Sequence, residues 1–285
     1  MDVGPYGSSG HGHRDKLHLS IRIGGQHLLV DSGRFAYEGD LAKKFRGVYV
    51  EHTRAHNALL VDGFQQLASP AVTTTPLVEG KDWNSTNTSD AVFASIEFDG
   101  IKDKGTAVHT RGMVYIRGDM WVVVDRLVTD SKRTVEAIWH VHPSCDVSNV
   151  SSVHALIVAN ATAVRPGSGL AIAMTTVSDW TWNNVSVVKG RMEPTPQGWY
   201  SPHYNSAYPS PAIILEGNVG SAEDQTRGTT SAYLSAYAMI PFQTLGAMHS
   251  LPTIKIIATT DSSATVQVSH NGADTNVTVE LGTFV

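Results

Sequence analysis

The chain has 285 residues, of which 41% are hydrophobic and 16% are charged, and its formal net charge is −5. This length is enough for one large hydrophobic core or two small ones. No apolar run of about 18 residues occurs, which excludes a membrane-spanning helix, and the lack of a basic stripe or arm argues against nucleic-acid binding. The single cysteine, Cys145, excludes an internal disulfide framework and a cysteine-based zinc site.

Alternation of apolar and polar residues dominates the chain, which is typical of half-buried β-strands. Leu17–Ile23 is the first such run; Gly24-Gly25 then predicts a tight turn, and Gln26–Val30 the returning strand of a hairpin. Lys16 and His18 alternate with the apolar residues of the first run, so both are expected to face solvent. Further strands are predicted at Ala58–Val61, Val92–Phe98, Ala107–Ile116, Met120–Val124, Val135–Val141, Ala155–Ala159, Leu170–Thr175, Ala212–Leu215, Ile254–Thr259, Thr265–Val268 and Val277–Leu281.

Helical periodicity is nearly absent, and residues 40–50 predict one short helical turn at most. Gly118-Asp119 predicts another tight turn between two strands. The longest stretches without a strand pattern are Leu67–Asp90, Ser201–Pro211 and Gly217–Thr230. Many short strands separated by turns predict an all-β fold, a large antiparallel multi-stranded β-sandwich that spans residues 1–285 as one domain.

The charge is unevenly distributed. Residues 1–60 hold eight Lys/Arg, six Asp/Glu and six of the thirteen histidines, so this part has a balance of +2 while the rest has −7. A local positive site for an anionic small molecule or polymer is therefore compatible with the acidic total, because clefts focus the field of nearby charges.

Glycosylation sequons are frequent, since six asparagines stand in Asn-X-Ser/Thr: Asn84, Asn87, Asn149, Asn160, Asn184 and Asn276. They predict a secreted glycoprotein or a protein of the secretory pathway. The first residues lack the basic and apolar regions of a signal peptide, so such a signal is expected upstream of Met1. Coincidental matches in a Ser/Thr-rich β protein are the alternative interpretation.

Two imidazoles and a carboxylate are candidates for a metal site. His13 precedes the first predicted strand, Asp31 ends the returning strand, and His56 precedes the third. The hairpin brings the chain back to its start, so His13 and Asp31 are expected to be neighbours. Nitrogen and carboxylate donors with one open position suit a zinc-type ion. In an extended segment His11 faces away from His13 and is left free for chemistry.

Two other interpretations of these residues remain open. The histidines can be ordinary surface or core residues, because His-X-His arises easily by chance in a chain with thirteen histidines. His13-Arg14-Asp15 with His56 also satisfies the facial-triad pattern of non-haem iron oxygenases. Those enzymes need a basic residue soon after the distal histidine to anchor a keto-acid cosubstrate, and none follows His56.

Several ordered motifs resemble the β-sandwich domain of heparinase II/III-like polysaccharide lyases, a group with heparin/heparan and alginate (oligoalginate) lyases whose architecture dermatan sulfate epimerase shares. The resemblance spans roughly residues 2–240. The motifs that carry it are Gly4-Pro5-Tyr6-Gly7, Gly10-His11-Gly12-His13-Arg14-Asp15-Lys16-Leu17, Leu28-Leu29-Val30-Asp31-Ser32-Gly33, His56-Asn57-Ala58-Leu59-Leu60-Val61-Asp62-Gly63, Tyr115 through Asp125-Arg126-Leu127 to Trp139-His140-Val141-His142-Pro143, and Gly198-Trp199-Tyr200-Ser201-Pro202 with Tyr204.

The resemblance implies a role for individual residues. His11 matches the histidine that contributes to catalysis, and Asp15 a recurrent acid that orients a histidine. Arg34 and Tyr37 match substrate contacts more loosely. The family's metal ligands, with Zn²⁺ as the expected ion, match three residues of this chain: His13, Asp31 and His56.

The resemblance also implies a reaction, the β-elimination of an anionic uronate polysaccharide or oligosaccharide. Family enzymes carry an N-terminal helical toroid that supplies further catalytic residues, and this chain shows no such helical pattern. The chain is therefore expected to be part of a longer two-domain enzyme, with weak or no activity in isolation. Two alternatives are a non-catalytic glycan-binding remnant and one half of a uronate C5-epimerase.

Overall fold

The computed structural model describes residues 1–3, 11–68, 72–73, 89–101, 104–177, 179–220, 230–248 and 250–283. Strands dominate this part of the chain, and the helical elements are α1 (Gly39–Phe45), η1 (Thr53–Ala55) and η3 (Leu245–Ala247). The strands are β1 (Ile21–Ile23), β2 (Gln26–Leu29), β3 (Leu59–Val61), β4 (Val72–Thr73), β5 (Ser89–Glu97), β6 (Ala107–Ile116), β7 (Met120–Thr129), β8 (Arg133–His140), β9 (Cys145–Ser148), β10 (His154–Ala159), β11 (Gly169–Val177), β12 (Trp180–Lys189), β13 (Trp199–Tyr200), β14 (Tyr208–Pro209), β15 (Pro211–Val219), β16 (Ser231–Phe242), β17 (Thr253–Thr259), β18 (Ser263–His270) and β19 (Ala273–Glu280).

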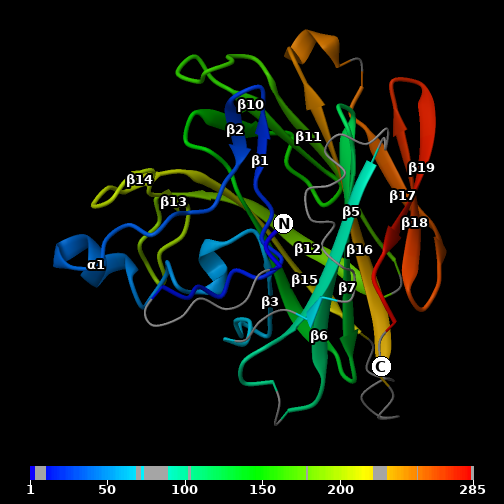
Figure 1. The fold of residues 1–285 in the computed structure, drawn as a ribbon, viewed down its shortest axis with the longest axis horizontal. Helices are drawn as coiled ribbons and strands as arrows, with labels where there is room; N and C mark the ends of the chain where they lie inside the picture. The colour runs from blue at the N-terminus through cyan, green and yellow to red at the C-terminus, as the bar shows by residue number, and fades with distance from the viewer. Residues whose placement is uncertain are drawn as a thin grey trace.

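Two large sheets form the sandwich (Figure 1). One has eight strands in the order β4-β5-β6-β7-β16-β11-β10-β9, and the other has four in the order β12-β15-β8-β3. Neighbouring strands run antiparallel in both sheets. The predicted all-β antiparallel sandwich is thus confirmed.

The main core lies between these sheets. Leu127 of β7, Ile172 of β11 and Tyr237 of β16 come from the larger sheet, and they share one apolar cluster with Trp139 of β8 and Ile213 of β15. None of these side chains is more than 1% exposed. Because full burial of such a side chain contributes about 1.5–3 kcal/mol, this contact is the main source of stability of the sandwich.

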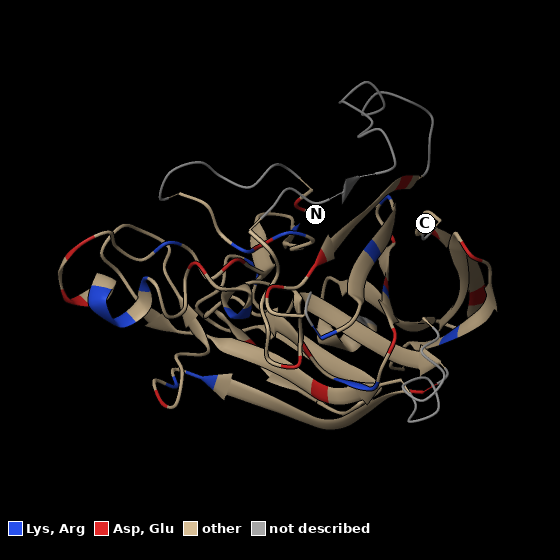
Figure 2. Ribbon diagram, turned by 90° about the horizontal axis from the view of Figure 1, so that it is seen from below, with Lys and Arg blue, Asp and Glu red and all other residues tan. Residues whose placement is uncertain are grey.

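A third sheet, β17-β18-β19, covers the other face of the large sheet. Val122 and Val124 of β7 pack there in one cluster with Ala264, Val266 and Val279 of the small sheet. In Figure 1 these last strands (orange to red) lie at the end of the molecule opposite to α1. In Figure 2 the ribbon of α1 is coloured blue for basic residues, and Lys43 and Lys44 occupy its last helical turn. No described helix is long and apolar enough to cross a membrane.

The predicted hairpin is confirmed, but its first strand is shorter than expected. Ile23 pairs with Gln26 across Gly24 and Gly25, which both have positive φ. The prediction that residues from Leu17 onward form a strand is wrong, because β1 begins only at Ile21 and Leu17 itself has a φ of 67°.

Lys16 and His18 are buried, so the prediction that they face solvent is also wrong. Since residues 16–20 are not a pleated strand, their alternation does not divide them between core and solvent. Lys16 instead turns inward, where its Nζ lies 2.9 Å from Asp2 and 3.2 Å from Asp15. Leu17 packs in a separate cluster with Ala94 and Ile96 of β5.

Some predicted features lie outside the described residues. They include the Gly4–Gly7 motif, Gly10 at the start of the second motif, most of the Leu67–Asp90 and Gly217–Thr230 stretches, and the sequons at Asn84 and Asn87. Of the other sequon asparagines, Asn149, Asn184 and Asn276 are exposed and Asn160 is half-buried. Glycosylation and secretion stay predictions.

Candidate functional site

Three chain segments meet at the open end of the β1–β2 hairpin. His13 lies in the loop before β1, Asp31 follows β2, and His56 follows η1. Nδ1 of His56 lies 2.6 Å from Oδ2 of Asp31, and the ring centroids of His13 and His56 are 5.4 Å apart. His13 and Asp31 therefore both lie beside the imidazole of His56, but among the described residues the predicted ligands His13, Asp31 and His56 do not form a single group of ligand atoms within 4.8 Å of one another.

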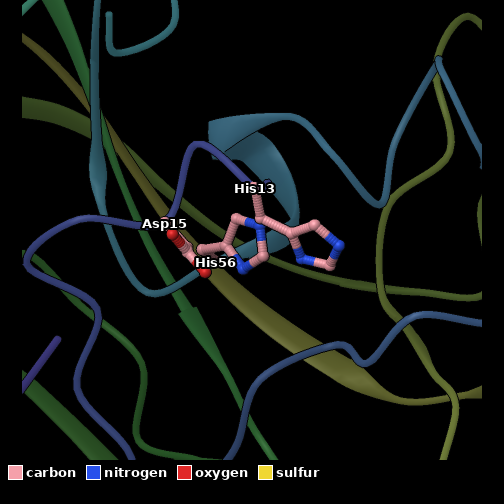
Figure 3. Close-up of side chains that lie close together, drawn as sticks. All are labelled: His13, Asp15 and His56. Carbon is pink, nitrogen blue, oxygen red and sulfur yellow. The ribbon is translucent and has the colours of Figure 1, made fainter. Parts of the chain in front are cut away.

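Two groups of possible ligand atoms share His56. One consists of His13, Asp15 and His56 and the other of His18, Asp31 and His56, and within each group the atoms lie within 4.8 Å of one another. Figure 3 shows the His56 ring between the Asp15 carboxyl group and the imidazole of His13 in that view. Asp15 thus lies close enough to His13 and His56 to be a possible ligand with them.

The Asp31–His56 contact has the character of an ion pair. Partial burial alone would raise the pKa of Asp31, but the charge and hydrogen bond of His56, with the N–H of Gly33 at 2.8 Å, hold it well below its usual value. Burial opposes protonation of His56, but Asp31 outweighs it and raises the pKa of this imidazole. Gly33 has a φ of 85°, and a Cβ there would overlap the carbonyl oxygen of Ser201, so the turn after Asp31 requires glycine.

His18 is not free to bind an ion, although its Nδ1 lies 3.8 Å from Oδ2 of Asp31. The backbone N–H of Asn57 donates to this same Nδ1 atom at 2.9 Å. The proton of the neutral ring is therefore on Nε2, which donates to Oγ of Ser20 at 2.8 Å. Burial lowers the pKa of His18 to about 4, so the ring stays neutral.

A second cluster contains the predicted catalytic and substrate-binding residues. Nδ1 of His11 lies 3.0 Å from the hydroxyl of Tyr37, and Nη1 of Arg34 donates to the same hydroxyl at 3.3 Å. Because this oxygen accepts from Arg34, its own proton is available to Nδ1 of His11. The guanidinium of Arg34 contacts two neighbouring phenol rings, 5.2 Å from the centroid of Tyr37 and 5.6 Å from that of Tyr204.

A family model described as "Heparinase II/III-like, C-terminal" matches residues 1–240. The chain belongs to the heparinase II/III-like family. The matched region is the C-terminal domain of proteins in this polysaccharide-lyase family. The search of curated proteins yields no match.

Solved structures similar to this heparinase II/III-like chain share its fold. The heparan sulfate lyase HepC from Pedobacter heparinus has a TM-score of 0.73 and 18% identity, covering 100% of this chain and 39% of that protein. A heparinase III gene product has a TM-score of 0.69 and 18% identity, with coverages of 99% and 38%. Another heparinase III has a TM-score of 0.67 and 14% identity, with coverages of 95% and 36%. The chain thus spans about two-fifths of the length of the structures it matches.

The residues of this heparinase II/III-like domain fit a divalent ion of the zinc type. Nε2 of His56 is buried and has no hydrogen-bond partner, and a buried imidazole nitrogen without a partner is costly unless something binds it. His13 and Asp15 lie close enough to share an ion there, while Asp31 occupies the Nδ1 side. Asp15 is already paired with Lys16, which leaves Asp31 as the carboxylate without a lysine or arginine partner in the described part of the chain.

Residues that the sequence did not single out complete the surroundings. Arg46 lies 5.2 Å from the centroid of the Tyr37 ring and donates to the Tyr37 carbonyl oxygen at 3.2 Å. A hollow of about 510 Å³ beside Tyr37 is lined by Lys43, Arg46 and Glu51, among others. Tyr204 belongs to a motif of the resemblance, but no sequence signal indicated that it flanks Arg34.

Metal-free protein is expected to lose stability as the pH falls from about 7.5 to about 5.5. Burial lowers the pKa of His18 to about 4 and that of His140 to about 3. Both values lie below the value of about 6.5 for an unfolded histidine, so the unfolded state takes up more protons as the pH drops, at a loss of about 1.4 kcal/mol for each residue at pH ~5.5.

His56 acts in the opposite direction. Its raised pKa stabilises the folded state at acid pH, and this contribution is lost as the pH rises through the folded-state pKa. The contribution of His56 opposes those of His18 and His140, whose pKa values are both strongly lowered. The net change in the free energy of unfolding is therefore expected to have the sign that His18 and His140 give it. Urea unfolding in the presence of a chelator at both pH values measures it, and a free energy of unfolding that stays constant or rises on acidification contradicts the prediction.

Proposed function

We propose that this domain takes part in the β-elimination of a uronic-acid-containing polysaccharide. The observation that carries the proposal is the hydrogen bond between His11 and Tyr37 beside the guanidinium of Arg34. This contact supports the proposal because an imidazole hydrogen-bonded to a phenol can transfer a proton beside a cation that can bind a carboxylate, in a chain of a polysaccharide-lyase family.

The reaction removes the proton at C5 of the uronate and breaks the bond to the glycosidic oxygen at C4, which leaves with a proton. Negative charge develops at the carboxylate when C5 loses its proton, and Arg34 stabilises it there through its fork of N–H donors. His11, hydrogen-bonded to Tyr37, holds or moves a proton beside this carboxylate. We propose that an N-terminal helical toroid supplies the remaining acid–base groups, so that the chain alone has weak or no activity.

We propose that His13, Asp31 and His56 hold a divalent ion, with Zn²⁺ expected, and that Asp15 supports this set. The ion supplies a structural link between the loop of His11 and His13 and the segments of Asp31 and His56. His11 is two residues from His13, so fixing one imidazole limits the positions of the other.

Replacing Arg34 with alanine is expected to weaken the binding of uronate oligosaccharides by about ten- to a hundredfold, because hydrogen bonds to charged groups contribute about 1.5–3 kcal/mol. Calorimetric titration with alginate, heparan sulfate and chondroitin oligosaccharides measures the affinity. Arg165→Ala is the matched control, since Arg165 is an exposed arginine outside this cluster. Equal affinity of the Arg34 and Arg165 variants contradicts the assignment of Arg34.

Absorbance of the unsaturated uronate product separates lyase chemistry from the alternatives. The assay is run on the chain alone and on a longer protein in which the proposed N-terminal helical toroid precedes this chain. Binding without product in either form favours a glycan-binding domain. Solvent deuterium at C5 without chain cleavage favours a C5-epimerase half. The proposal is supported if the wild-type protein forms the unsaturated product and the Tyr37→Phe variant does not.

A further inference from the structure

We propose that Asn57 is the positioning residue of the candidate metal centre. This proposal rests on the proposed function, because it concerns how the chain holds His56 and Asp31 for an ion. Asn57 is fully buried and directly follows His56. It does not touch the ion site itself; it fixes the segments that carry the site.

The side chain of Asn57 joins three segments, which contain Leu19 before β1, Val30 after β2 and His140 at the end of β8. Two of them are also paired through the main chain, since the N–H of Val30 donates to the carbonyl oxygen of His140 at 3.0 Å. Its Nδ2 donates to the carbonyl oxygen of Leu19 at 2.8 Å and to that of Val30 at 3.2 Å. Its Oδ1 accepts from the backbone N–H of His140 at 2.6 Å and from Nδ1 of the same ring at 3.1 Å. Both amide hydrogens and both lone pairs are therefore used, which is the full capacity of an asparagine side chain.

The ring of His140 fixes the orientation of this carboxamide. Nε2 of His140 lies 3.1 Å from the hydroxyl of Tyr49 and 3.0 Å from the amide nitrogen of Gln197, which are both donors to it. The neutral ring therefore carries its proton on Nδ1 and donates it to Asn57. Only the carboxamide oxygen can accept this proton, so the amide nitrogen must face Leu19 and Val30.

The main chain of Asn57 adds two further links. Its N–H donates to Nδ1 of His18 at 2.9 Å, and its carbonyl oxygen accepts from Nη1 of Arg111 at 2.7 Å. The same Nη1 also donates to the carbonyl oxygen of Leu17 at 2.8 Å. Arg111 thus links the main chain of Asn57 to the loop before β1.

These bonds add to the backbone pairing between Val30 and His140 and extend it to the segment of Leu19. Residues 11–20 and 30–36 contain no strand, so the buried carbonyl groups of Leu19 and Val30 need another partner. Asn57 supplies it: its bond to Val30 ends next to Asp31, and Asn57 itself adjoins His56. Loss of the carboxamide frees both segments, and the Asp31–His56 contact then loses its fixed geometry.

The test compares Asn57→Ala and Asn57→Asp with Val266→Ala, a control whose side chain is buried in the remote β17–β19 cluster. Asn57→Asp keeps the acceptor for His140 but has no donor for Leu19 and Val30. The first readout is the downfield proton resonance of the Nδ1–H of His56 in its short hydrogen bond to Asp31, recorded without metal. We expect it in wild type and in Val266→Ala, and its loss or broadening in both Asn57 variants.

The second readout is titration with Co²⁺, whose visible spectrum reports coordination geometry. We expect Asn57→Ala and Asn57→Asp to bind Co²⁺ at least tenfold more weakly and with an altered spectrum, while Val266→Ala binds it as wild type does. If wild type binds no Co²⁺, the proposed metal site fails, and the proton resonance alone decides the role of Asn57. An unchanged resonance in the Asn57 variants overturns the positioning role.

A wild-type measurement covers the case in which the Asn57 variants do not fold. The carboxamide protons of Asn57 are expected to exchange with solvent as slowly as the backbone N–H groups of the core strands, because both are buried and hydrogen-bonded. Rapid exchange of these two protons overturns the proposal without any variant.

Discussion

Replacing Asp125 with asparagine is expected to lower the free energy of unfolding by about 3–5 kcal/mol, because it leaves a buried guanidinium without its counter-charge. Arg111 donates from Nε to Oδ1 of Asp125 at 2.7 Å and from Nη2 to Oδ2 at 2.9 Å. Nε2 of His109 lies 2.9 Å from the same Oδ1. The side chains of all three are at most 1% exposed. Burial alone would raise the pKa of Asp125, but Arg111 outweighs it and holds the pKa well below its usual value.

Urea unfolding of wild type and variant measures this loss. Asp90→Asn is the matched control, because Asp90 also pairs with an arginine, Arg117, at 2.7 Å, but with side chains 40% and 26% exposed. Exposed ion pairs contribute about 0–1 kcal/mol, so the control is expected to lose little stability. Equal losses in the two variants contradict the assigned role of the buried charge cluster.

This cluster also connects stability with the site. Arg111 is held by Asp125 on one side and binds the carbonyl oxygens of Leu17 and Asn57 on the other. A change at Asp125 is therefore expected to affect the loop before β1 as well as the sheet. Through Arg111, a core strand of the large sheet thus contacts the main chain of the residue next to His56, which lies outside that sheet.

Strands that alternate clearly and are flanked by turns were predictable from the sequence. The Gly24-Gly25 hairpin and β6 (Ala107–Ile116) agree with their predicted positions. β16 (Ser231–Phe242) was missed although it is a central strand of the large sheet. It is covered by the small sheet on one face and by the core on the other, so eight consecutive residues are buried and no alternation marks it. β12 (Trp180–Lys189) was missed for a different reason, because this edge strand is largely exposed and polar.

The residues of the candidate site were indicated by the resemblance to the family, and the hairpin accounts for only part of their arrangement. It returns the chain toward its start, where His11 contacts Tyr37 and Tyr37 contacts Arg34, but the Asp31–His56 contact also depends on the segment around η1, which the hairpin does not place. The partners that support them come from far along the sequence. Asn57 meets His140 across 83 residues, and nothing local in either segment indicates this contact.

Zinc is expected to stabilise the wild-type chain and to lose this effect when His13 is replaced by alanine or Asp31 by asparagine. An ion that binds only the folded state contributes about 2.7 kcal/mol at a free concentration of about 100 times its Kd. Unfolding with excess Zn²⁺ and with a chelator measures the difference for each variant. His270→Ala, on the remote strand β18, controls for adventitious binding to surface histidines and is expected to keep the wild-type difference.

The comparison of Asp31→Asn with Asp15→Asn decides which carboxylate binds the ion. Asp15 shares the positive charge of Lys16, whereas Asp31 contacts the imidazole of His56 through a hydrogen bond of 2.6 Å. The nitrogen of His56 that would hold an ion has to be unprotonated, so the affinity is expected to fall as the pH is lowered. Asp15→Asn is expected to weaken binding by about 10–100-fold without abolishing it. If Asp15→Asn abolishes the stabilisation and Asp31→Asn only weakens it, the ligands are His13, Asp15 and His56, and the proposed role of Asp31 as a ligand is wrong.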